Sequence, residues 1–205
     1  MKFYLSSYLI GNQSEKLKEM VPGRQIGYIP NALDLSDADP ERVRRHVERD
    51  MGLLRALSLE VWLVDLRYYF GEPSKLRKKL DELRAIFVSG GNVFVLRQAM
   101  NLSGLDVLLK EFRSKGNFLY AGYSAGGCVL SPSLRGYEIV DPIDTPYNEL
   151  KDVIWDGLGF LDHSFIPHWN SAHPESAAIE ETIDYYKKNR IPYTPIRDGD
   201  VLIIE

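Results

Sequence analysis

Short apolar runs alternate with longer charged segments along most of the chain. Runs of consecutive apolar and aromatic residues between turn residues are typical of buried strands. The pattern predicts strands over residues 3–10, 25–30, 60–66, 85–88, 118–121 and 164–166. Two late runs, 193–196 and 201–204, predict a closing hairpin around Asp198 and Gly199.

The charged segments between these runs predict helices. The clearest covers Pro40 to Leu57, because Asp39 suits the N-cap and Pro40 suits the first helical position. Its apolar positions then recur at helical spacing, at Val43, Val47, Leu54 and Leu57. Further helices are predicted over 74–83, 93–100, 104–114 and 174–189, and a loop over 138–153.

This alternation of strands and helices predicts an α/β fold with a mostly parallel central sheet. The nearly continuous apolar strands fit a sheet covered by helices on both faces, a three-layer sandwich. No repeat or linker divides the 205 residues, so one domain over 1–205 is expected. Ligands bind such sheets at the carboxyl ends of strands, which directs attention to the residues after Val88, Ala121 and Ile166.

Composition narrows the class of protein. An apolar share of 44% and a charged share of 26% are typical of a soluble globular domain and argue against disorder. The net charge of −4 gives no support to nucleic-acid binding, and no apolar run approaches the ~20 residues of a membrane-spanning helix. The single cysteine, Cys128, excludes an internal disulfide and favours a cytoplasmic location.

The segment Gly122-Tyr123-Ser124-Ala125-Gly126 follows the fifth predicted strand and matches the G-x-S-x-G nucleophile elbow. Glycines allow the tight strand-to-helix turn that lifts a serine hydroxyl above the sheet. The turn also directs the Ala125 amide toward the place where an oxyanion would form. The alternative is a glycine-rich turn with a buried capping serine.

Ser89-Gly90-Gly91-Asn92 follows the fourth predicted strand. Paired glycines there permit close approach of the backbone to a ligand, and Gly91 is expected to supply a second oxyanion amide beside that of Ala125. A simple turn is the alternative.

His168 lies just after the sixth predicted strand, where it is placed to act as general base for Ser124. A hydrogen-bonded structural histidine is the alternative. His46 is expected to be solvated on a charged helix. His163 and His173 flank His168 at five-residue steps that fit neither a strand face nor a helix turn, so no metal site is expected.

A triad also needs a carboxylate to orient the histidine. Asp198 is the favoured candidate, although an ordinary Asp-Gly turn explains it equally well. Asp162 and Glu175 are competitors near His168. An α/β-hydrolase order would instead require an acid between Ser124 and His168, and three are available there: Asp141, Asp144 and Asp152.

Together these segments resemble the peptidase E family. Residues 89–96 are similar to its G-G-N-T-F-x-L segment, and 121–127 to its G-x-S-A-G segment. Residues 157–161 with 167–169 resemble its G-L-G-x-L and P-H-F stretch, and Asp198-Gly199 falls where the family carries an acid and glycine. The matches occur in the family's order over about residues 85–200.

The resemblance implies a flavodoxin-like fold of the class I glutamine amidotransferase type. It implies Ser124 as nucleophile, His168 as base and Asp198 as the third member, with Gly91 and Ala125 as the oxyanion hole. The family includes aspartyl dipeptidases and cyanophycinases, and no cofactor or metal is implied.

The chain departs from the family in one respect. Aspartyl-dipeptide members hold the substrate carboxylate with an arginine after the catalytic histidine, but residues 169–186 here contain no Arg or Lys. A different pocket is therefore expected. Its candidate substrate contacts, chosen by proximity along the chain, are Asn92, Trp169, Asn170, His173 and Glu175. For Trp169, packing against the base loop is the stronger interpretation.

The sequence thus predicts a serine hydrolase that cleaves amide bonds of small peptides through an acyl-enzyme. One alternative is a binding or regulatory module on the same fold, and another is an α/β-hydrolase esterase. The expected partner is a small peptide rather than nucleic acid or membrane. Monomer and homodimer both remain open.

Overall fold

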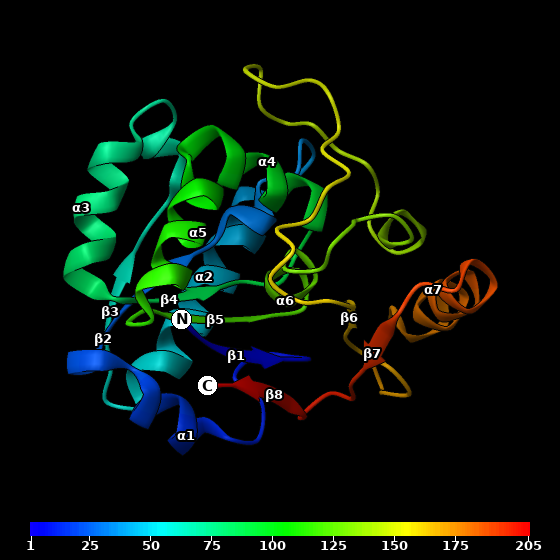
Figure 1. The fold of residues 1–205 in the computed structure, drawn as a ribbon, viewed down its shortest axis with the longest axis horizontal. Helices are drawn as coiled ribbons and strands as arrows, with labels where there is room; N and C mark the ends of the chain where they lie inside the picture. Colours follow the sequence, from blue (N-terminus) through cyan, green and yellow to red (C-terminus); the bar gives the residue numbers. More distant parts are fainter.

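A six-stranded sheet runs through the centre of the molecule (Figure 1), and the computed structural model describes residues 1–205. The strand order is β3-β2-β4-β5-β1-β8, in which only β8 runs antiparallel to its neighbour. A separate pair, β6 and β7, is parallel. The strands are β1 Lys2–Ser6, β2 Gln25–Ile29, β3 Glu60–Leu63, β4 Ala85–Val88, β5 Leu119–Tyr123, β6 Ser164–Ile166, β7 Tyr193–Pro195 and β8 Val201–Ile204.

Helices cover both faces of this sheet. The helices of the chain are α1 Ser14–Met20, α2 Pro40–Ala56, α3 Pro73–Leu83, α4 Val93–Ser103, α5 Leu105–Lys115, α6 Ala125–Cys128 and α7 Ser176–Asn189. Alternate residues of one strand face opposite layers, as the period of a strand requires. On β1, Tyr4 packs into a cluster with residues of α1 and α2, whereas Phe3 packs into a larger cluster with residues of α3, α4 and α5.

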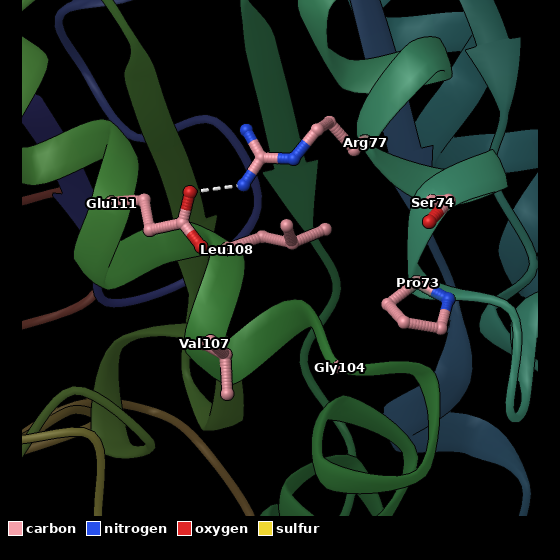
Figure 2. Close-up of a pocket in the computed structure, with 7 residues that line it drawn as sticks. All are labelled: Pro73, Ser74, Arg77, Gly104, Val107, Leu108 and Glu111. Atoms are coloured by element: carbon pink, nitrogen blue, oxygen red, sulfur yellow. Dashed lines mark hydrogen bonds and ion pairs between the residues drawn. The ribbon is translucent and has the colours of Figure 1, made fainter.

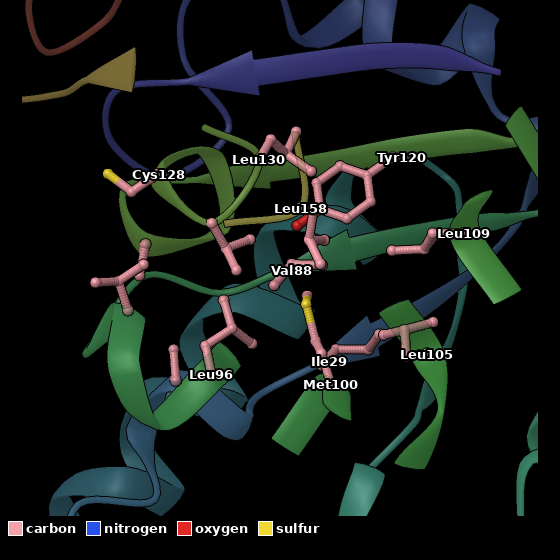
Figure 3. Packing of buried hydrophobic residues seen from close by; sticks show 14 of the residues in the cluster. Ile29, Val88, Leu96, Met100, Leu105, Leu109, Tyr120, Cys128, Leu130 and Leu158 are labelled. Carbon is pink, nitrogen blue, oxygen red and sulfur yellow. The ribbon is translucent and has the colours of Figure 1, made fainter. Parts of the chain in front are cut away.

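The larger cluster forms the main core. Figure 3 shows how Val88, Tyr120 and Ile29 of the sheet meet Leu96 and Met100 of α4. All five side chains are buried. This packing confirms the predicted α/β architecture with a mostly parallel sheet. Burial on both faces holds for β4 and β5, but not for the edge strand β3, where Trp62 and Leu63 are exposed.

The helix predicted over 40–57 is confirmed with almost the same bounds. Asp39 caps it, accepting a hydrogen bond from the Glu41 amide at 3.0 Å. Helix α1 was not predicted, since the segment is only seven residues long and buries just Leu17 and Met20. The first strand ends at Ser6 rather than at residue 10, because a turn follows in which Gly11 has a φ of 64°.

The predicted closing hairpin is wrong. β7 pairs with β6, whereas β8 joins the central sheet and pairs with β1 (Figure 1). The segment between them still turns, since the Asp200 amide donates to the Arg197 carbonyl at 2.9 Å. The turn is fixed against the loop after β1, where the Ser7 amide donates to the Asp200 carbonyl at 3.1 Å. Asp198 therefore lies at the carboxyl end of β1. Among the helices, none is both long and apolar enough to cross a membrane.

Candidate active site

Ser124 occupies a strained turn between β5 and α6. Its φ of 47° and ψ of −116° lie in a region that side-chain-bearing residues rarely adopt. The turn is possible because Gly126 packs against β4, where a Cβ atom would lie only 2.6 Å from the Val88 carbonyl oxygen. Ser124 is half-buried, and its side chain makes no cap hydrogen bond to α6. The capping-serine alternative therefore does not fit this geometry.

Two backbone amides near Ser124 have no acceptor within the protein. They belong to Ala125, the first residue of α6, and to Gly91, which follows β4. Gly91 has a φ of 138°, and a Cβ there would lie 2.3 Å from the Ala32 carbonyl oxygen, so only glycine fits. The Gly90–Gly91 segment is thus more constrained than a simple turn requires.

His168 and Asp198 form a hydrogen-bonded pair. His168 Nδ1 lies 2.7 Å from Asp198 Oδ1, and because the carboxylate accepts, Nδ1 carries the proton and leaves Nε2 with a lone pair. His168 is 1% exposed. Burial lowers the pKa of His168 below its usual value, and the bond to Asp198 only partly opposes this effect. The imidazole is therefore held neutral, the form in which it can accept a proton.

Ser7, which the sequence reading missed, connects the two members of this pair. Its hydroxyl donates to Asp198 Oδ1 at 2.7 Å and accepts from the His168 amide at 2.8 Å. Ser7 is fully buried. Ser171 supports the same arrangement, because its hydroxyl accepts from the Asp198 amide at 2.8 Å. The short polar residues thus fix both backbones around the pair.

Three of the competing acids are bonded to other groups, and Asp152 is exposed with no bond to His168. Asp162 is bonded to His163, Asp141 accepts from the Val93 amide, and Asp144 accepts from Ser36. Glu175 is the nearest rival, with Oε2 at 3.9 Å from His168 Nε2, which is beyond hydrogen-bond distance. Asp198 is the carboxylate that hydrogen-bonds His168.

Ser124 and His168 line one pocket of about 800 Å³ at the carboxyl ends of the sheet strands. Gly90 and Gly91 border it after β4, and Tyr8 borders it after β1. No hydrogen bond joins Ser124 Oγ to His168 Nε2 in this structure. Such contacts are often long in substrate-free sites and shorten when substrate binds.

The five predicted substrate contacts divide into two groups. Asn92, His173 and Glu175 line the pocket, whereas Trp169 and Asn170 do not. Asn92 Oδ1 caps α4, and Nδ2 donates one hydrogen bond to the Pro142 carbonyl at 2.7 Å. Asn92 therefore serves as a structural cap of α4 at the border of the pocket. Trp169 packs on the core, with the Arg197 guanidinium 5.1 Å from its ring centroid.

His173 stacks on His168, with ring centroids 3.7 Å apart and planes 8° from parallel. With Glu175 these rings place three potential metal-ligating atoms within 4.8 Å of one another. His173 Nδ1, however, accepts from the Glu175 amide at 3.3 Å. The nitrogen lone pairs of the two rings lie in nearly parallel planes, whereas the ligands of one ion must converge on it. The cluster is better arranged to cover the His168 ring than to bind a metal ion.

Cys128 is buried one turn beyond Ser124, and burial raises the pKa of its thiol well above the usual value. A second, smaller cleft of about 310 Å³ lies between α3 and α5. Figure 2 shows its floor, where Arg77 and Glu111 form an ion pair beside Leu108. This cleft contains no nucleophile paired with a base, so the larger pocket is the candidate active site.

His46 was expected to be solvated, but it is half-buried and bonds to Tyr123 at 2.7 Å. Beneath it, Asp50 Oδ2 accepts from Tyr123 at 2.7 Å and from Tyr28 at 2.8 Å. Although burial opposes ionisation, the hydrogen bonds from His46 and Tyr123 keep the pKa of Asp50 below its usual range. These contacts attach α2 to the end of β5 beside Ser124, and spacing along the sequence gave no signal for them.

With this geometry in place, the chain can be compared with known proteins. The model of peptidase family S51 matches residues 10–205. The chain belongs to peptidase family S51. It is 30% identical over 184 residues to an uncharacterized peptidase of Listeria monocytogenes, covering 89% of this chain and 82% of that protein. It is also 30% identical over 189 residues to peptidase E of Streptomyces coelicolor, covering 89% and 69%.

A solved structure extends the likeness to the fold. The crystal structure of a candidate peptidase E protein from Listeria monocytogenes superposes with a TM-score of 0.79 at 25% identity, over 99% of this chain and 93% of that one. The fold and the family predicted from the sequence are both confirmed. As a member of family S51, the protein is a serine-type peptidase.

Proposed function

We propose that the protein hydrolyses amide bonds of small peptides, with Ser124 as nucleophile, His168 as general base and Asp198 as the orienting acid. The observation that carries this proposal is the 2.7 Å bond between His168 and Asp198 in the pocket that Ser124 also lines. Asp198 fixes the tautomer that leaves His168 Nε2 free to accept the serine proton. The family and the peptidase E relatives support the reaction class.

The reaction divides into two halves. Ser124 Oγ attacks the carbonyl carbon while His168 Nε2 takes its proton, and the resulting oxyanion is held by the unpaired amides of Gly91 and Ala125. When the C–N bond breaks, His168 returns the proton to the leaving amine. Water, activated by the same nitrogen, then hydrolyses the acyl-enzyme and regenerates Ser124.

A panel of di- and tripeptides, followed by release of free amine, tests this function. Ser124→Ala should lower turnover by at least about 10³-fold, because the nucleophile and the base act as a unit. Cys128→Ala is the matched control, since the thiol is buried and lies one turn further along the same segment. It should keep most of the activity of the native protein. Equal turnover by Ser124→Ala on a verified substrate would contradict the proposal.

A further inference from the structure

One face of helix α2 forms a wall of the active-site pocket. Arg42, Arg45, His46 and Arg49 all line this pocket together with Ser124 and His168. Their spacing of three, four and seven residues from Arg42 puts them on one side of an α-helix. The wall is therefore built from a segment more than 70 residues away from Ser124 in the chain.

Two of these arginines have no carboxylate partner. Arg49 is committed to Asp50, with its Nη2 2.8 Å from Oδ1. Arg42 and Arg45 are exposed, and no carboxylate lies within ion-pair distance of either. By contrast, Arg44 on the same helix points away from the pocket and pairs with Glu41 and Glu48 at 2.8 and 2.7 Å.

Two of the four carboxylates that line the pocket are bonded to backbone amides. Asp39 caps α2, Asp141 accepts from the Val93 amide, and Glu175 lies 3.9 Å from both His168 and His173. The carboxylates of the exposed Asp37 and the half-buried Glu175 accept no hydrogen bond, but neither lies within ion-pair distance of Arg42 or Arg45. Two guanidinium groups thus face the pocket without a neutralising partner.

We propose that Arg42 and Arg45 form an anion subsite that binds a carboxylate of the peptide and so determines specificity. The inference rests on the proposed function, because the ligand is taken to be its substrate. A planar guanidinium binds a carboxylate through two parallel hydrogen bonds, which gives both affinity and orientation. The helix after His168 offers no competing cation, since residues 169–186 contain neither Arg nor Lys.

The carboxylate has two possible sources in a short peptide, an acidic side chain or the free C-terminus. Binding of matched pairs to Ser124→Ala separates them without turnover: Asp-Ala against Asn-Ala, and Ala-Ala against Ala-Ala amide. Titration calorimetry on Ser124→Ala should show that the charged member of at least one pair binds about tenfold more tightly. The pair that shows this preference identifies the source.

Arg42 and Arg45 are then substituted in the Ser124→Ala protein. Arg42→Gln with Arg45→Gln should remove most of that tenfold preference, chiefly by weakening the charged peptide. Arg44→Gln, the matched control from the same helix, should retain it. Absence of a charge preference in both pairs, or a preference that survives the double substitution, would overturn the inference. A charge preference that depends on these arginines, combined with no turnover by the native protein, would instead contradict the proposed function alone.

Discussion

His168 Nδ1 lies 2.7 Å from Asp198 Oδ1, and Ser7 contacts both residues at once. The aspartate comes from the turn before β8, whereas the histidine follows β6. The pair forms only because β8 crosses to β1 and brings the turn over the loop that carries Ser7. The orientation of the proposed base therefore depends on three segments that meet at one end of the sheet.

Asp198→Asn should lower kcat by roughly 10²–10⁴-fold with a smaller change in KM, because the amide favours the wrong histidine tautomer. Asp200→Asn is the control, since Asp200 is exposed on the same turn. Steady-state kinetics on any verified peptide measures both. If Asp198→Asn kept a third or more of the native kcat, the pairing would not be catalytic, and Glu175 would be the next acid to substitute.

Ser7→Ala should disturb the hydrogen-bonded pair of His168 and Asp198. The substitution leaves the His168 amide without an acceptor and removes a donor from Asp198, which costs about 1–3 kcal/mol for buried groups. Thermal unfolding should shift down by several degrees. For a positioning residue kcat should also fall, by about tenfold, with KM nearly unchanged. Loss of stability with an unaltered kcat would limit Ser7 to a structural role. Ser114→Ala, exposed on α5, is the control for a lost hydroxyl.

The fold was largely predictable because its information is local. The apolar runs that became β2, β4 and β5, and the cap and periodicity of α2, each lie within one short segment. The partner with which a strand pairs is not encoded in its own segment. Val201–Ile204 pairs antiparallel with Lys2–Ser6, which lies almost the full chain away, so the predicted hairpin was wrong. Ser124, His168 and Asp198 carried signals because each follows a strand or lies in a turn with a recognisable motif.

The rest of the site depended on contacts across the chain. Ser7 is 161 residues from His168, and nothing in its own neighbourhood marks it. Helix α2 was predicted, but the face that enters the pocket is decided by the contacts of His46 and Asp50 with Tyr123. Of the substrate contacts chosen by proximity to His168, Trp169 and Asn170 do not line the pocket.

The rate of hydrolysis should stay high below the usual pKa of histidine. Burial lowers the pKa of His168, and the neighbouring His173 lowers it further. Since the base works only when neutral, the acid limb of the profile of kcat/KM against pH should lie below pH ~6.5. His173→Gln removes the imidazole that stacks on His168, and with it part of the burial that lowers this pKa, so it should move the limb to higher pH. A limb unmoved by that substitution would contradict the assignment.

The free energy of unfolding should fall as pH rises, because Asp141 binds a proton more tightly in the folded protein than in the unfolded chain. Burial raises the pKa of this carboxyl to about 7. The folded state then binds a proton that the unfolded state releases near pH ~4, so the stabilising effect of that proton is lost as pH rises toward and past 7. Asp141→Asn should raise Tm by several degrees at pH 8 and by much less at pH 5, relative to the native protein. The exposed Asp152→Asn is the control. An equal effect at both pH values would exclude this titration.

The central claim is that Ser124 is activated by His168, and covalent labelling tests it most directly. Purified protein is treated with a fluorophosphonate and its intact mass is measured, with Ser124→Ala and His168→Ala in parallel. The account predicts one adduct per chain on the native protein and none on either variant, with all three folded by circular dichroism. A folded native protein that stays unlabelled, or labelling that persists in Ser124→Ala, would contradict it.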